Sequence, residues 1–284
     1  MDVHQKDDRG RTALHRAALV GERGRCENLL TSGARVDEED YDNETPLSLA
    51  ADQGHTGVCE LLLDHEAHVD HEDQDGATPL TLAAEEGHTG VCEVLLDHGA
   101  QVDHENQYGG DTALSLAADR GHTDVCELLL DHGAHVDHEN QYGNTPLILA
   151  AFQGHTDVCE VLLDHGAQVD HEDGWGNTAL TLAAYRGHTD VCELLVDHGA
   201  RVDHENEEGA TALSLAVQEN HYSVARLLSE SGADGHRMLL ELLSQQNFEM
   251  ADCLMAGGPG MTRIEDPRIQ RALEIVVKYH ATKK

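Results

Sequence analysis

Short apolar stretches alternate with polar stretches in a fixed order along the chain. A stretch of the form Leu-x-Leu-Ala-Ala precedes a Gly-His pair, and a second stretch, Val-Cys-x-x-Leu-Leu, follows it. The spacing of the apolar residues predicts two short helices in each unit, each with one buried face. The polar stretch that comes next, for example 169–176, predicts an extended finger with a turn at its glycine.

The unit occurs seven times, and a threonine before each first helix marks it. Successive threonines are 33 residues apart, with one interval of 34. One unit is too small to close its own core, so the pattern predicts a stack in which neighbouring units bury one another. The additional residue lies at Gly109-Gly110 in the fourth finger, where paired glycines predict a loosened backbone. The marker residues are Thr12, Thr45, Thr78, Thr112, Thr145, Thr178 and Thr211.

Helix boundaries follow from the same unit. The marker threonine is expected to cap the first helix, and proline, where present, suits its first turn. The threonine of Gly-His-Thr is expected to cap the second helix, and Gly-Ala ends that helix because glycine tolerates positive φ.

These phrases resemble ankyrin repeats, whose family pattern combines a finger, T-P-L-H-x-A-A, G-H, V-x-x-L-L and G-A. The resemblance implies an all-α ankyrin-repeat solenoid of stacked helix-turn-helix units with extended, β-hairpin-like fingers. The family's histidine after T-P-L survives only as His15, and serine, threonine or isoleucine replaces it elsewhere. The family also uses the Gly-His histidine to tie neighbouring units together. The repeat boundaries are 7–39, 40–72, 73–105, 106–139, 140–172, 173–205 and 206–238, which together form 7–238.

The two ends of the chain differ from the middle. Residues 1–6 are expected to be an N-terminal tail, and the first repeat is basic, as suits a capping repeat whose outer face meets water. Residues 239–261 are expected to form a degenerate helical cap repeat. Apolar spacing over 262–284 predicts a C-terminal amphipathic helix and a basic tail.

The net charge of the chain limits the kinds of partner that it can bind. The chain has 284 residues and a net charge of −36, which argues against binding to nucleic acid or to an anionic membrane surface. Between 36 and 200 there are 36 acidic residues but only two basic ones, Arg120 and Arg186. No apolar run is long enough for a membrane span, and 1–6 show no signal peptide. We therefore expect no membrane insertion and an intracellular, cytoplasmic location, with the nucleus as the alternative.

No pattern of catalytic residues is present, so the chain is predicted not to be an enzyme and to need no cofactor. Phosphate-binding glycine loops and nucleophile motifs are missing, and the carboxylate pairs recur in every repeat, whereas an active site should occur once. Six cysteines at equivalent positions are expected to be buried, reduced thiols. The 22 histidines also recur once per unit, so no specific metal site is predicted. Low-affinity ion buffering by the acidic and histidine rows remains an alternative function.

Positions that differ between near-identical repeats indicate where a partner binds. They cluster at the finger tips and at the ends of the first helices, which in proteins that this chain resembles line a concave face. Aromatic and arginine residues dominate interface hot spots. The sequence therefore predicts a monomeric protein-interaction scaffold or adaptor, which binds a protein segment with basic and apolar residues in an acidic groove. The two arginines either contact that partner or relieve repulsion among carboxylates. An architectural spacer is the rival interpretation. The candidate site residues are Tyr108, Arg120, Tyr142, Phe152, Trp175, Tyr185 and Arg186.

Overall fold

The computed structural model describes residues 3–235 together with 238–239, 242, 247, 249–251 and 254. In this part of the chain all regular structure is helical, which confirms the all-α prediction; the fingers consist of turns and contain no strand. The chain divides into two compact units. Unit 1 comprises 1–146 and 164–167, and unit 2 comprises 147–163 and 168–284. Most of the predicted cap repeat at 239–261, and the whole of 262–284, lie outside the described residues.

Each repeat contributes a short first helix and a slightly longer second helix. The first helices are α1 (Ala13–Leu19), α3 (Pro46–Asp52), α5 (Pro79–Glu85), α7 (Ala113–Arg120), α9 (Pro146–Gln153), α11 (Ala179–Arg186) and α13 (Ala212–Gln218). The second helices are α2 (Arg23–Thr31), α4 (Thr56–Asp64), α6 (Thr89–Asp97), α8 (Thr123–Asp131), α10 (Thr156–Asp164), α12 (Thr189–Asp197) and α14 (Tyr222–Glu230).

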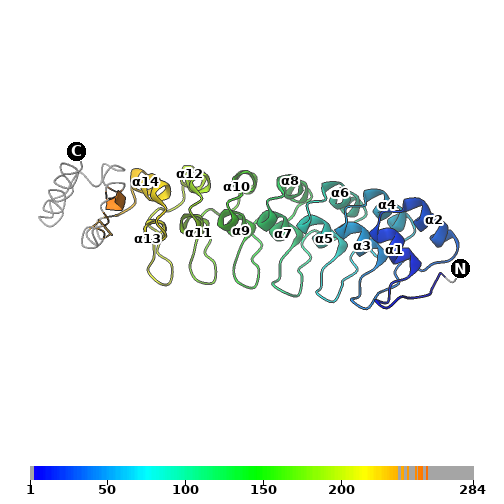
Figure 1. Ribbon diagram of the computed structural model, residues 1–284. Coiled ribbons are helices and arrows are strands. Elements are labelled where there is room, and N and C mark those ends of the chain that lie inside the picture. The colour runs from blue at the N-terminus through cyan, green and yellow to red at the C-terminus, as the bar shows by residue number, and fades with distance from the viewer. Residues whose placement is uncertain are drawn as a thin grey trace, which may run out of the picture. The chain divides into compact units, whose positions relative to one another are not determined.

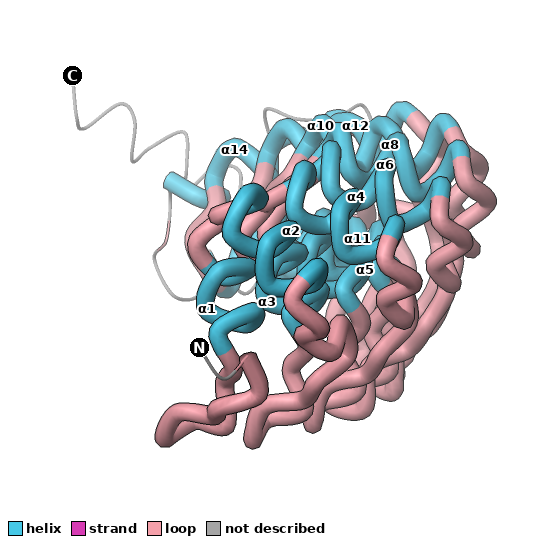
Figure 2. The backbone as a smooth tube through the Cα atoms, turned by 90° about the vertical axis from the view of Figure 1, so that its right-hand side faces the viewer, coloured by secondary structure: helices cyan, strands magenta, loops and turns pink. Residues whose placement is uncertain are grey.

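Two helical layers and a row of fingers make up each unit. In unit 1, α1, α3, α5 and α7 lie side by side, and α2, α4, α6 and α8 form the second layer (Figure 1). In unit 2, α11 and α13 are neighbours in the first layer, and α12 and α14 are neighbours in the second. The fingers project past the first helices, on the side away from the second helices, as Figure 2 shows in pink. Finger tips are therefore the parts of a repeat farthest from its second helix.

Threonine caps the first helices, as predicted. The Thr45 hydroxyl accepts a hydrogen bond from the backbone N–H of Ser48 at 3.2 Å, and the Ser48 hydroxyl accepts one from the Thr45 N–H at 2.7 Å. Thr78 and Thr81 make the same reciprocal pair. Serine and threonine thus satisfy the helix N-terminus at the position where His15 does so in the first repeat.

The second helices are capped differently from the prediction. The N-cap of α4 is His55, and Thr56 is already the first helical residue, without a side-chain capping bond at this end. The imidazole of His55 reaches the preceding repeat instead, where its Nε2 is hydrogen-bonded to the Leu19 carbonyl at 3.1 Å. Because this tie joins residues 36 apart, the histidine position is fixed by the neighbouring repeat rather than by local capping.

The core of each repeat is built from small and branched side chains. Leu80, Ala83 and Ala84 of α5 are fully buried, as are Cys92 and Leu95 of α6. Alanine lets neighbouring first helices approach closely, and leucine fills the space between the two layers. The equivalent residues of the second, fourth, fifth and sixth repeats are buried in the same way, so these repeats share one core although their surfaces differ.

Buried cysteines form part of this core, and all six at the repeated position are thiols, as predicted. Burial raises the pKa of Cys26 to about 11 and those of Cys59, Cys92, Cys159 and Cys192 to about 12. A thiol of such high pKa is almost entirely protonated at neutral pH and is a poor nucleophile and metal ligand. The seventh cysteine, Cys253, lies outside the described residues.

Candidate partner-binding face

Each finger is held by a side chain at its first residue. In the sixth finger, Asp173 Oδ1 accepts hydrogen bonds from the N–H groups of Trp175 and Asn177, both at 2.8 Å. In the fifth finger, Asn140 does the same for Tyr142 and Asn144, both at 3.0 Å. An oxygen that accepts from two later N–H groups closes the turn and fixes the first of the two donating residues at the tip. Tyr142 and Trp175 are those tip residues.

The additional residue of the fourth finger changes this bonding. Asn106 Oδ1 accepts from Gly109 at 3.2 Å and from Asp111 at 3.1 Å, so the bond that would fix Tyr108 goes to the inserted glycine. The bond to the next finger is shifted by one residue as well. The Gln141 N–H donates to the carbonyl of Gly109, at 2.7 Å, and not to that of Tyr108. Tyr108 is more exposed than its counterpart, with 73% of its surface in solvent against 53% for Tyr142.

Neighbouring fingers are joined by one backbone bond and one histidine. Between the third and fourth fingers, the Gln107 N–H donates to the Asp75 carbonyl at 3.0 Å. His104 Nε2 is bonded to the Gly76 carbonyl at 3.2 Å, and it lies 3.8 Å from Glu72 Oε1. In the first repeat His15 instead reaches forward to the next finger. In the third repeat, where threonine replaces the family's histidine after T-P-L, His104 thus supplies the histidine bond between fingers.

The predicted aromatic side chains are exposed to solvent. Trp175 is 55% and Tyr185 40% exposed, in addition to Tyr108 and Tyr142, whereas Phe152 is half-buried. A hydrogen bond to the Asp75 carboxylate raises the pKa of Tyr108. Tyr108, Arg120 and Tyr142 belong to unit 1, and Phe152, Trp175, Tyr185 and Arg186 belong to unit 2. The structure therefore divides the predicted residues between two units.

Comparing the repeats of this chain with one another did not identify Tyr41 as a site residue, although it is 64% exposed in the second finger. It lies one position before the tip residue, and its ring covers Gly10 of the first finger: a Cβ placed on Gly10 would lie 2.7 Å from Tyr41 Cδ1. The signal that could have found it is an aromatic residue in a polar finger, at a position where other repeats carry glutamine, as in Gln74.

In the second to fourth repeats, which belong to unit 1, the ends of the first helices carry acidic residues. Arg120, at the end of α7, donates a hydrogen bond to the Glu85 carboxylate at the end of α5, and this bond raises the pKa of Arg120. The interpretation that this arginine relieves repulsion among carboxylates is therefore supported for unit 1. The residues at these helix ends are Asp52, Gln53, Glu85, Glu86, Asp119 and Arg120.

In unit 2 the equivalent positions carry two aromatic residues, two glutamines, one arginine and one glutamate. The guanidinium carbon of Arg186 lies 4.7 Å from the centre of the Phe152 ring, a cation–π contact between consecutive repeats. Burial lowers the pKa of His188, which follows α11, and the charge of Arg186 lowers it further. The residues at these helix ends are Phe152, Gln153, Tyr185, Arg186, Gln218 and Glu219.

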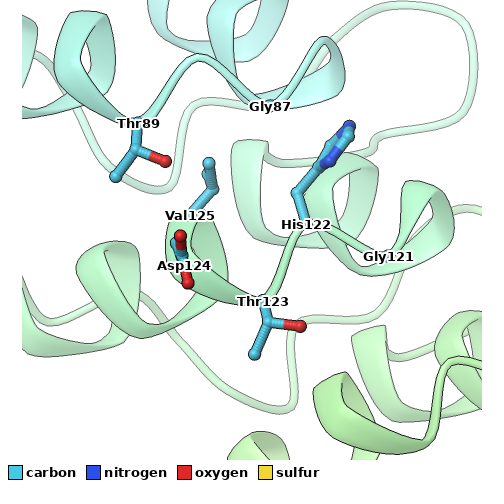
Figure 3. A pocket seen from close by; sticks show the side chains of 7 residues that line it. All are labelled: Gly87, Thr89, Gly121, His122, Thr123, Asp124 and Val125. Carbon is cyan, nitrogen blue, oxygen red and sulfur yellow. The ribbon is translucent and has the colours of Figure 1, made fainter.

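The depressions of the surface recur from repeat to repeat. One is lined by Gly87, His122 and Asp124 and neighbours at the turns into α6 and α8 (Figure 3). Its equivalent in unit 2 is lined by Gly154, His188 and Asp190 with their neighbours. Both are open and mostly polar, and a feature present in each unit does not have the character of a single catalytic cleft.

One acidic cluster in the second finger combines carboxylates that lie close together. Asp40, Asp42 and Glu44 place one oxygen each within 4.8 Å of one another. Arg11 of the first repeat already neutralises part of this charge, because it donates to Asp40 at 2.8 Å and also to Glu44. Arg11 therefore links the first finger to the acidic cluster of the second finger.

Comparison with known proteins agrees with this architecture. The profile described as "Ankyrin repeats (3 copies)" matches residues 14–106, 100–173 and 167–238. The crystal structure of the human ASB11 ankyrin repeat domain superposes with a TM-score of 0.70 at 32% identity, covering 75% of this chain and 96% of that one. No curated protein sequence matches significantly. Among the described residues, no helix combines the length and apolarity that a bilayer span requires. The predicted solenoid fold is thereby confirmed, and the chain belongs to the ankyrin-repeat family.

Proposed function

We propose that the chain is a non-enzymatic interaction scaffold that binds a basic and apolar protein segment across its finger tips and first-helix ends. Ankyrin repeats generally mediate protein–protein interaction. The observation that carries the proposal is the exposure of Tyr108 and Tyr142 in unit 1 and of Trp175 and Tyr185 in unit 2, at finger tips and a first-helix end. Large aromatic side chains left in water lose the stabilisation that burial would give them, and a partner restores it.

Conserved packing beneath a variable surface supports the same function. The second to sixth repeats bury the same leucine, alanine and cysteine positions, while finger tips and first-helix ends change from one repeat to the next. If the array served only as a spacer, nothing would favour aromatic residues at these exposed positions. The bonds at finger bases, such as those of Asp173, hold the tips in place before a partner arrives. A preformed site loses less entropy on binding.

Electrostatics select the partner's charge. The net charge of −36 attracts a basic segment and repels nucleic acid. In unit 1, Asp52, Glu86 and Asp119 lie at successive first-helix ends, and only Arg120 lies among them. Such carboxylates at or near the surface act mainly on the association rate, and salt weakens their effect.

Affinity capture with a matched pair of variants tests this function. The quadruple Ala variant of Tyr108, Tyr142, Trp175 and Tyr185 is compared with Tyr222→Ala, which removes an aromatic side chain 37% exposed at the start of α14. Proteins captured from lysate at two salt concentrations are quantified by mass spectrometry. We expect proteins with basic segments to bind the unchanged chain and the Tyr222 variant, and to be lost from the quadruple variant and at high salt.

Circular dichroism of both variants separates lost binding from lost folding. The proposal requires equal helix content and similar melting temperatures, because the four side chains contribute little to the core. Capture that is equal for all three proteins would overturn the proposed face. Calorimetric titration with Ca²⁺ and Zn²⁺ addresses the alternative of an ion buffer, for which the exposed acidic rows would have to take up several ions per chain.

A further inference from the structure

Arg186 differs from the other described cations of unit 2 in what it contacts. Arg201 forms ion pairs with Asp170 at 3.2 Å and with Glu172 at 3.4 Å, and Arg226 pairs with Glu230 at 2.8 Å. Arg186 stacks on the Phe152 ring, and within the described residues no carboxylate or carbonyl accepts from its guanidinium. Its side chain is exposed at the end of α11.

Arg120 occupies the equivalent position in unit 1 and provides the contrast. Each arginine reaches back to the residue that precedes it by 34 or 35 positions, at the end of the first helix of the previous repeat. In unit 1 that residue is Glu85, which accepts a hydrogen bond and neutralises the charge. In unit 2 it is Phe152, whose ring supports the guanidinium plane but takes none of its N–H bonds. Arg120 therefore has a carboxylate partner in unit 1, whereas Arg186, at the equivalent position in unit 2, can accept one from a bound protein.

The stacked arrangement prepares the guanidinium for an oxyanion. Phe152 lies against the guanidinium, with its ring centre 4.7 Å from the guanidinium carbon, which restricts the side chain, and no carboxylate or carbonyl of the described residues takes the N–H groups. A carboxylate can accept two parallel N–H bonds from such a fork. Tyr185, next in the chain and 40% exposed, provides an apolar surface beside it.

We propose that Arg186 is the receptor for an Asp or Glu side chain of the bound protein segment, and that Phe152 and Tyr185 hold an apolar residue beside that carboxylate. The inference rests on the proposed function and sharpens it. The partner segment is basic overall, because the chain carries −36, but it contains one acidic residue that meets the available arginine of unit 2. A carboxylate fits this setting better than a phosphate, because a group of nearly two negative charges is repelled more strongly by the acidic surroundings.

A displayed random dodecapeptide library tests the partner's chemistry without a known partner. The full chain, the Arg186→Gln variant and the Arg120→Gln variant are each used for selection. We expect the unchanged chain and Arg120→Gln to enrich peptides that combine lysine or arginine, an apolar residue and one Asp or Glu. Selection on Arg186→Gln should lose the acidic residue and keep the basic ones.

A double-mutant cycle with one selected peptide then tests the contact itself. Calorimetry measures the unchanged chain and Arg186→Gln against the peptide and its Glu→Gln form. We expect each single change to weaken binding about 10- to 100-fold, the range for a hydrogen bond to a charged group, and the double change to add little. Arg120→Gln should stay within about twofold, because its guanidinium already serves Glu85.

The possible outcomes are distinct. Peptides that bind without an acidic residue, or additive effects in the cycle, overturn the role of Arg186 and leave the proposed binding function standing. A phosphoserine peptide that binds more tightly than its glutamate form assigns the site to phosphate and overturns the carboxylate proposal. If no peptide is enriched by any of the three proteins, both this inference and the proposed binding of a protein segment fail. Equal melting temperatures of the three proteins verify that the variants are folded.

Discussion

Arg120 at the end of α7 donates a hydrogen bond to the carboxylate of Glu85 at the end of α5, and so places a positive charge between the carboxylates of two consecutive repeats. Both side chains are partly exposed, with 55% and 31% of their surfaces in solvent. Exposed ion pairs contribute little to stability and are screened by salt. The consequence of this contact is therefore electrostatic relief, on a surface that is otherwise acidic.

Replacing Arg120 by Ala should lower the free energy of unfolding by less than about 1 kcal/mol in dilute buffer. The loss should shrink further in 1 M salt, because screening removes the repulsion that the arginine relieves. Urea denaturation at both salt concentrations measures the difference. Arg120→Met retains much of the apolar stem and serves as the control for lost packing. A loss that is equal at both salt concentrations would assign Arg120 a packing role instead.

Gly87 and Gly99 provide a matched pair for the ties between repeats. Both have positive φ, +76° and +83°, so alanine at either position costs about 1 to 2 kcal/mol of backbone strain. A Cβ on Gly87 would lie 2.6 Å from the His122 ring, whereas nothing lies within 4 Å of one on Gly99. Gly87→Ala should therefore also disturb the bond between His122 Nε2 and the Glu85 carbonyl, 2.9 Å long.

We expect Gly87→Ala to destabilise the chain by at least about 1 kcal/mol more than Gly99→Ala, roughly the net value of one hydrogen bond. Thermal and urea unfolding followed by circular dichroism measure both variants. Similar losses would show that the histidine tie contributes nothing beyond backbone strain. In a His122→Ala background, Gly87→Ala and Gly99→Ala should destabilise the chain about equally, because neither the clash nor the histidine bond is then present.

The buried thiols predict a loss of stability at alkaline pH. Their folded pKa is about 12 at Cys59, Cys92, Cys159 and Cys192, above the value of about 8.5 for a free thiol. A group whose folded pKa is raised keeps its full contribution below the unfolded pKa and loses it as pH rises toward the folded pKa. The melting temperature should therefore fall between about pH 8.5 and 12.

Replacing one cysteine with alanine separates this effect from general alkaline denaturation. Cys92→Ala should melt lower than the unchanged chain at pH 7 because of the cavity it creates, and its melting temperature should fall less steeply with pH. In the folded chain at pH 8, the thiols of the described residues should not react with a disulfide reagent until urea is added. Rapid reaction of these six without urea, or parallel pH profiles of the two proteins, would contradict the assignment.

Repetition decided which parts of the structure could be predicted. The Thr45 cap, the leucine and alanine core and the Cys92 position recur in the sequence, so their period alone shows which side is buried. Contacts between repeats could not be predicted in this way. The histidine at the start of α4 is positioned by Leu19 of the preceding repeat, and the sequence pattern alone favoured Thr56 as the cap.

At the candidate site, too, the contacts of the two arginines with the preceding repeat could not be predicted from the sequence. Arg120 and Arg186 hold equivalent positions, and the sequence left relief of repulsion and partner contact open for both. The difference arises from Glu85 and Phe152, which lie one repeat earlier and meet the arginines only in the folded structure. Tyr41 was overlooked because it precedes the tip position at which the fingers were compared.

The fourth finger carries the last prediction, because its additional glycine leaves Tyr108 without the bond that fixes Tyr142. The Tyr142 N–H donates to Asn140 Oδ1 at 3.0 Å, whereas Asn106 Oδ1 accepts from Gly109. We expect the Tyr108 amide to exchange its hydrogen faster than the Tyr142 amide, measured by NMR at equal pH. Deleting Gly109 should give the finger the length of its neighbour, slow exchange at Tyr108 and reduce the exposure of its ring. If the two amides exchange at the same rate, or if the deletion leaves the Tyr108 rate unchanged, the inserted residue does not control how this aromatic side chain is presented.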